Sequence, residues 1–296
     1  MAVFKGAGVA IATPFNEDGS VNYEEFGRLI DFQIDNGTDA IVVCGTTGES
    51  ATMTEEEHVD VIRYCVQHVA HRVPVVAGAG SNCTKTAQYL SSQAQSCGAD
   101  AILSVTPYYN KATQDGLIAH YTAIASVTDL PVIIYNVPSR TGTNVQPSTM
   151  AKLYHDVDNI VGIKDAVGDL AQTSHMLALV DDADFELYSG EDGLIVPLMA
   201  LGGIGVISVL SNVAPRQTHD ICRMMLEGDI KGARALQLKA LPLVDALFCE
   251  VNPIPVKAAL EMIGIKAGPL RLPLTPMSDA HHEQLEREMR AFGLIS

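Results

Sequence analysis

Short apolar segments recur through the first two thirds of the chain, and this repetition restricts the fold more than any other feature. Each segment is a continuous apolar run rather than an alternation of apolar and polar residues, which is typical of parallel strands buried on both faces. The starts lie roughly 20 to 35 residues apart, enough for a strand, a loop and a helix. They fall at Gly8, Ala40, Pro74, Ala101, Pro131, Ile160, Phe185 and Gly205. Eight such units predict an α/β fold, a (β/α)8 TIM barrel, over residues 1–214.

Helical patterns fill the gaps between these runs. Residues 21–37 carry a single apolar stripe, and Gly37 is expected to end that helix. Thr54, followed three residues later by Glu57, is a capping-box pattern at the start of the next helix. Residues 215–296 show only helical patterns, with no low-complexity linker before them. We therefore expect an all-helical C-terminal region packed on the barrel.

The charge balance excludes two classes of partner. Nineteen lysine and arginine residues against 35 aspartate and glutamate residues give a net charge of −16, which argues against nucleic acid or an anionic membrane as the partner. No apolar run reaches the length of a membrane span, and the first residues lack the apolar core of a signal peptide. The six cysteines show neither CxxC nor metal-ligand spacing, so we expect reduced thiols in a cytoplasm and no metal site.

Polar and aromatic residues follow five of the predicted strands. In a (β/α)8 barrel, the residues that perform chemistry lie where the strands end. One polar strand end would mean little, but five on one rim predict a small-molecule site. Their sequences are CGTTGES from Cys44, TPYYNK from Thr106, YNVPSRTG from Tyr135, KDA from Lys164 and SGED from Ser189.

Lys164 is the least expected residue among them, because it follows directly on the apolar run that begins at Ile160. Taken alone, it fits a lysine at a strand end whose amine reaches solvent. In a dry pocket, however, the pKa of the same amine would fall toward neutrality, and the neutral amine could form a Schiff base with a ketone. Asp165 points to the opposite side of the strand and is expected to be structural.

Other residues on this rim suit a carbonyl substrate that carries a carboxylate. Tyr135 is either a core tyrosine or a phenol that moves protons near an imine. Arg140 is either a solvated loop residue or a residue whose planar guanidinium binds a substrate carboxylate through two hydrogen bonds. Thr46 and Thr47 lie between glycines, either in a simple tight turn or in a loop whose hydroxyl and N–H groups hold a carboxylate.

Seven motifs together resemble those of one family. They are GTTGESAT, TPYYNK, YNVPSRTG, GIKDA, SGED, GVISV and NPIPVKAAL. The chain resembles the 4-hydroxy-tetrahydrodipicolinate synthases, formerly dihydrodipicolinate synthases, which are pyruvate-dependent lyases of the class I aldolase and N-acetylneuraminate lyase superfamily. The resemblance covers essentially the whole chain. Tyr135 and Lys164 are shared across the superfamily, whereas YYN and Arg140 are more specific to these synthases.

The resemblance implies a reaction that needs no cofactor. Lys164 would form a Schiff base with pyruvate, and the resulting enamine would attack the aldehyde of L-aspartate 4-semialdehyde. This is the first committed step of the diaminopimelate route of lysine biosynthesis. Tyr135 would pass protons through Thr47 to Tyr109, which in this family reaches in from a neighbouring subunit.

The resemblance also implies how the substrates are held. Thr46 and Thr47 would bind the carboxylate of pyruvate, and Arg140 would bind the carboxylate of the semialdehyde. Gly190 and Ile207 would add backbone contacts near the bound pyruvate.

The family is most often a homotetramer built as a dimer of dimers, with Leu201 where the second interface usually forms. In relatives that lysine inhibits, the inhibitor site resembles positions Ser50, Ala51, His58, Asn82 and Tyr108 of this chain. Glu55 and Thr86 stand where sensitive enzymes often have histidine and glutamate. Because Thr86 cannot pair with an ammonium group, we expect weak or absent inhibition by lysine.

Two alternatives stay open at the level of the sequence. One is a sibling aldolase that acts with pyruvate on a keto-sugar acid, which seldom needs the guanidinium of Arg140. The other is a non-catalytic pyruvate-binding barrel, which would be expected to have lost at least one of the residues that the reaction needs.

Overall fold

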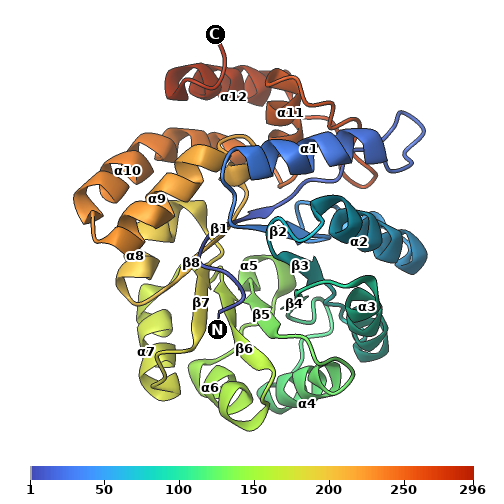
Figure 1. Ribbon diagram of the computed structural model, residues 1–296, viewed down its shortest axis with the longest axis vertical. Coiled ribbons are helices and arrows are strands. Elements are labelled where there is room, and N and C mark those ends of the chain that lie inside the picture. Colours follow the sequence, from blue (N-terminus) through green and yellow to red (C-terminus); the bar gives the residue numbers. More distant parts are fainter. Residues whose placement is uncertain (1) are drawn as a thin grey trace.

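Eight parallel strands close into a barrel in chain order, at the centre of the molecule in Figure 1. The computed structural model describes residues 2–296. β1 also pairs with β8, and this closure confirms the predicted (β/α)8 barrel. The strands are β1 (Gly6–Ala10), β2 (Ala40–Val43), β3 (Val75–Gly78), β4 (Ala101–Val105), β5 (Val132–Asn136), β6 (Ile160–Asp165), β7 (Glu186–Ser189) and β8 (Gly205–Ser208).

Small residues allow the barrel to close at the β1–β8 seam. Gly6 pairs with Gly205, and a Cβ at Gly205 would run into the carbonyl oxygen of Gly6. Because Gly6 already pairs with β8, β1 begins at Gly6, two residues before the predicted start at Gly8. Glycine and alanine at positions 6 and 7 have little apolar surface, so the sequence pattern does not reveal that they belong to the strand.

A ring of helices surrounds the barrel and buries the outer face of the strands (Figure 1). This covering on the outside explains why the strands are continuous apolar runs. A short helix, α5 (Pro138–Thr141), lies in the loop after β5. The barrel helices are α1 (Tyr23–Asp35), α2 (Glu55–Val69), α3 (Thr84–Cys97), α4 (Gln114–Ala125), α6 (Pro147–Asp156), α7 (Leu170–Val180) and α8 (Ile195–Ala200).

Two predicted helix ends can be compared with the structure. At the end of α1, Gly37 has φ 85°, and its N–H donates to the carbonyl oxygen of Ile34, while Thr38 N–H reaches that of Gln33. This is a Schellman motif, so Gly37 does terminate the helix. At the start of α2, Thr54 Oγ1 accepts from Glu57 N–H at 3.2 Å. The reciprocal half of the capping box is missing, because the carboxylate of Glu57 binds Arg271 instead.

The C-terminal region is helical, as predicted, and consists of α9 (Pro215–Glu227), α10 (Ile230–Leu247), α11 (Ile254–Met262) and α12 (Asp279–Phe292). α9 follows β8 after a single 3-10 turn at Leu210–Asn212 and packs against β1 and α8, so it takes the place of the eighth barrel helix. In Figure 1, α10, α11 and α12 gather on the side of the barrel near α1 and α9. α9 also packs against α10 and so connects the barrel to the later helices; the division at residue 214 stays a prediction.

Two further properties bear on the sequence expectations. Within residues 2–296, no helix is both long enough and apolar enough to cross a membrane. The thiols of Cys44, Cys65, Cys83, Cys97, Cys222 and Cys249 are all free.

Candidate active site

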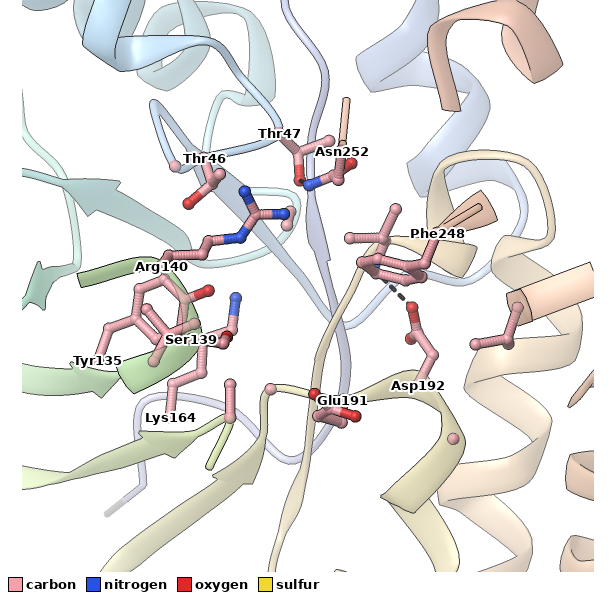
Figure 2. Close-up of a pocket in the computed structure, with 18 of the residues that line it drawn as sticks. Thr46, Thr47, Tyr135, Ser139, Arg140, Lys164, Glu191, Asp192, Phe248 and Asn252 are labelled. Atoms are coloured by element: carbon pink, nitrogen blue, oxygen red, sulfur yellow. Dashed lines mark hydrogen bonds between the residues drawn. The ribbon is translucent and has the colours of Figure 1, made fainter. Parts of the chain in front are cut away.

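A cavity of about 320 Å³ opens at the carboxyl ends of the barrel strands. Its walls come from the strand ends predicted to form one rim, together with α10 and the segment that follows it (Figure 2). The polar residues that line it are Thr46, Thr47, Tyr135, Ser139, Arg140, Lys164, Glu191, Asp192, Asp245 and Asn252.

Lys164 lies on β6 and is only 6% exposed. β5 and β6 are neighbours, and their register pairs Tyr135 with Lys164. The two side chains therefore lie side by side, with Lys164 Nζ 4.2 Å from the centre of the Tyr135 ring. Of the two alternatives for Lys164, the structure therefore favours an amine held in a pocket over one that reaches solvent.

The surroundings of Lys164 change its protonation. Burial lowers the pKa of its amine from 10.5 to about 7; the carboxylate of Asp192 opposes this change, and the guanidinium of Arg140 adds to it. A large share of the amine is then neutral at pH 7, with a free lone pair for attack on a carbonyl carbon.

Tyr135 and Arg140 form one side of the cavity. Burial raises the pKa of the Tyr135 phenol, whereas Arg140 and hydrogen bonding with Thr46 act in the opposite direction. The phenol therefore keeps its proton at neutral pH and can donate it. Arg140 belongs to α5, and in Figure 2 its guanidinium reaches across the mouth of the cavity toward Thr46.

The loop after β2 brings Thr46 and Thr47 to the rim, as predicted. Thr47 is buried, and its Oγ1 accepts a hydrogen bond from Asn252 Nδ2 at 3.0 Å. Asn252 lies between α10 and α11, far away in the sequence. Its place in the site went unpredicted, although it begins the NPIPVKAAL motif used to recognise the family.

Acidic residues form the opposite wall. Asp192 is buried; its Oδ2 accepts from the N–H groups of Val209 and Leu210 at 3.0 and 2.9 Å, while Oδ1 has no partner. Burial raises the pKa of Asp192, and hydrogen bonding with Ser208 and with the backbone of Leu210 and Val209 opposes the rise. Burial also raises the pKa of Glu191, and the charge of Asp192 adds to it. Both residues belong to the predicted SGED strand end, where sequence reasoning assigned no role to either carboxylate.

Of the remaining expected site residues, one lines the cavity and two do not. Gly190 lines the cavity. Ile207 lies on β8 inside the barrel, packed in a cluster with Tyr135 and Ala166, and is not one of the lining residues. Tyr109 is 89% exposed, has φ 74°, and stands outside the cavity of its own chain. The structure therefore brings together Lys164, Tyr135, Arg140, Thr46, Thr47 and Gly190, but neither Ile207 nor Tyr109.

A second cavity of about 460 Å³ adjoins the first and shares Thr46, Val137 and Arg140 with it. Four of the positions expected for an inhibitor line it, namely Ser50, Ala51, His58 and Tyr108. Asn82 is outside the lining, with its carbonyl oxygen accepting from Asn110 Nδ2 at 2.9 Å.

Glu55 and Thr86 also line the second cavity. Thr86 Oγ1 donates to Glu55 Oε1 at 3.0 Å. Burial lowers the pKa of His58, and its Nε2 lies 2.6 Å from the carbonyl oxygen of Gly78. This histidine is therefore neutral at pH 7 and adds no charge to the cavity.

Within the described part of the chain, no group of three or more histidine, cysteine, aspartate or glutamate side chains is arranged to hold a metal ion.

A barrel whose mouth encloses a buried amine with a near-neutral pKa, beside a phenol and a guanidinium, defines a class of enzyme that binds carbonyl substrates through lysine. Comparison with known proteins narrows the class. The model of the dihydrodipicolinate synthetase family matches residues 3–292. The chain belongs to this family.

Individual relatives agree with this assignment over their full lengths. The chain is 61% identical to 4-hydroxy-tetrahydrodipicolinate synthase of Lachnoclostridium phytofermentans, over 100% of both chains. Its fold is similar to dihydrodipicolinate synthase from Thermotoga maritima, with a TM-score of 0.97, 44% identity, and 99% and 100% of the two chains covered. The synthase from Cyanidioschyzon merolae with lysine bound has a TM-score of 0.97 at 40% identity, covering 100% of both chains.

Proposed function

We propose that this enzyme is a 4-hydroxy-tetrahydrodipicolinate synthase, a lyase that condenses pyruvate with L-aspartate 4-semialdehyde in lysine biosynthesis. The observation that carries the proposal is the buried Lys164 amine, with a pKa of about 7, facing Tyr135 at 4.2 Å in the cavity at the barrel mouth. Full-length similarity to synthases supports the choice of substrates.

In this proposal, the neutral amine of Lys164 attacks the ketone carbon of pyruvate, and loss of water from the adduct gives a protonated imine. Removal of a proton from the methyl group yields an enamine, whose carbon forms a bond with the aldehyde carbon of the semialdehyde. The amino group of the adduct then attacks the imine carbon, breaks its bond to Nζ and closes the ring. The covalent bond to Lys164 takes the place of a cofactor.

Proton transfer is assigned to Tyr135. Its raised pKa keeps the phenol protonated, so it can supply a proton to the hydroxyl that leaves as water during imine formation. Thr47 is the expected link to Tyr109 of a neighbouring subunit, but the side chain that hydrogen-bonds with Tyr135 is that of Thr46, so we assign this link to Thr46. Tyr109 is exposed and lies outside the lining of its own cavity, and both facts suit donation across an interface.

Carboxylate binding is divided between two sides of the cavity. Thr46 and Thr47, with the backbone around Gly190, would hold the carboxylate of pyruvate close to Lys164. Arg140, at the mouth, would hold the carboxylate of the semialdehyde. A role for Ile207 would be limited to its backbone or to shaping the barrel interior behind the imine.

If Tyr109 is supplied by a partner, at least a dimer is required. We propose a homotetramer built as a dimer of dimers, in which the partly exposed Leu201 contributes to the second interface. The barrel and the helical C-terminal region would act as one catalytic unit in the cytoplasm.

Borohydride reduction in the presence of pyruvate, followed by peptide mass spectrometry, tests the shared chemistry. We expect a pyruvate adduct on Lys164 and none in a Lys164→Met variant. Absence of the adduct from the unmodified enzyme would refute the proposal and favour a binding protein. Turnover with aspartate semialdehyde but not with sugar aldehydes then separates the synthase from a keto-sugar acid aldolase.

A further inference from the structure

The loop that carries Thr46 and Thr47 has an unusual backbone at both ends. Cys44 and Glu49, neither of them glycine, have φ of 55° and 54°, in the left-handed region. Side chains are disfavoured there because the Cβ crowds the backbone. Such residues persist only where surrounding contacts hold the chain in place, so the loop must be fixed from outside.

Glu49 provides the strongest of these contacts. Its side chain is fully buried, and Oε1 pairs with Lys257 Nζ at 2.9 Å; the Lys257 side chain is 3% exposed. Oε2 accepts from the N–H of Arg271 at 3.0 Å. Both carboxylate oxygens are therefore bound by the C-terminal region, and neither Glu49 nor Lys257 lines the substrate cavity.

Lys257 is itself tightly held. Its Nζ donates to the carbonyl oxygen of Pro269 at 2.7 Å and lies 4.4 Å from the centre of the Phe15 ring. The amine is thus surrounded by a carboxylate, a carbonyl and an aromatic face, which is a complete set of partners for a buried cation. The pair forms a rigid connection between the loop after β2 and α11.

A second contact from the same segment reaches Thr47. Asn252, just before α11, donates its Nδ2 hydrogen to Thr47 Oγ1. Because the oxygen of this hydroxyl accepts from Asn252, its own proton stays free to donate toward another acceptor in the cavity. Asn252 fixes the Thr47 hydroxyl directly, and Lys257 fixes the backbone two residues further along the loop.

We propose that the Glu49–Lys257 ion pair is a positioning device for Thr47. It touches neither substrate nor reacting atoms; it holds the backbone of the loop so that the Thr47 hydroxyl stays in the cavity wall, where it would donate to the pyruvate carboxylate. The inference rests on the proposed function, since it assigns the pair to the carboxylate binding of that reaction.

A double-mutant cycle tests the role. We expect Lys257→Met to lower kcat about tenfold or more, because a misplaced group loses its alignment with the reacting atoms. In a Thr47→Val background, which already lacks the hydroxyl, the same change should lower kcat by less than about twofold. A purely structural pair would give equal losses in both backgrounds, and that result would overturn the proposal.

Two further variants serve as a control and as a replacement if Lys257→Met does not fold. Lys152→Met, which breaks an exposed ion pair with Asp156, is the matched control and should leave kcat unchanged. If Lys257→Met does not fold, Glu49→Gln enters the same cycle, since it removes the charge but keeps the shape. Normal kcat in a folded Glu49→Gln enzyme, or loss of the fold in both variants, contradicts a specific positioning role.

Failure of this inference is distinguishable from failure of the proposed function. Pyruvate trapping on Lys164 is measured first in the unmodified enzyme. No adduct there refutes the function, whereas a normal adduct with additive losses in the cycle refutes only the role of Glu49 and Lys257.

Discussion

Replacing Lys164 by methionine should abolish activity and yet make the protein more stable at neutral and acidic pH. The folded protein lowers the pKa of this amine from 10.5 to about 7. Below pH 7 the amine is protonated in both the folded and the unfolded chain, and the folded state bears the full cost of a buried ammonium. Between pH 7 and 10.5 the unfolded chain binds more protons, so this cost declines as pH rises.

The size of the effect follows from the pKa difference. Each pKa unit corresponds to about 1.4 kcal/mol, so the buried ammonium destabilises the fold by about 5 kcal/mol below pH 7. Lys164→Met, which has a similar shape and no charge, should recover up to this amount at pH 6 and progressively less toward pH 10.

Urea unfolding of both proteins at several pH values between 6 and 10 measures the difference. Lys231→Met, at an exposed position on α10, serves as the control and should show no pH-dependent gain. If the stability gain of Lys164→Met were the same at every pH, the amine would not have a near-neutral pKa. The basis for its nucleophilicity would then be lost.

Three further results are expected. Arg140→Ala should raise KM for aspartate semialdehyde about 10- to 100-fold, as for loss of a charge-assisted hydrogen bond, while borohydride still traps pyruvate. Gly162→Ala should lower the free energy of unfolding by about 3 kcal/mol, measured in urea, because its Cβ would run into the backbone carbonyl of Glu186 on the next strand. Inhibition by lysine in a steady-state assay should be weak or absent; Thr86→Glu should strengthen it at least about tenfold, and a micromolar inhibition constant for the unmodified enzyme would contradict the expectation.

The barrel could be predicted from the sequence because a strand buried on both faces appears there as a continuous run of apolar residues. Every residue of β2 is buried, and so its sequence is apolar throughout. The position of α9 was harder to predict. Its pattern is that of an amphipathic helix like those that follow it, and only its contacts with β1 show that it completes the barrel.

The part of the candidate site that could be predicted consists of the residues at the ends of the barrel strands. Parallel strands of a closed barrel bring their carboxyl ends together, so Lys164, Tyr135 and Arg140 meet without further information. Asn252 and Phe248, which also lines the cavity, were missed because they enter it from the segment around the end of α10, whose path back to the barrel mouth leaves no periodic pattern in the sequence. Their place depends on tertiary contacts such as that between Asn252 and Thr47.

The wall that α10 and Asn252 contribute to the cavity has a consequence for the newly made protein. During synthesis, Lys164 leaves the ribosome well before residues 241–252, so the emerging barrel is open to water on that side. Water around the amine removes the desolvation that lowers its pKa, and the amine stays protonated. From this we expect the lysine of an unfinished chain to react slowly with ketones and aldehydes, and to gain its nucleophilicity when the last wall closes.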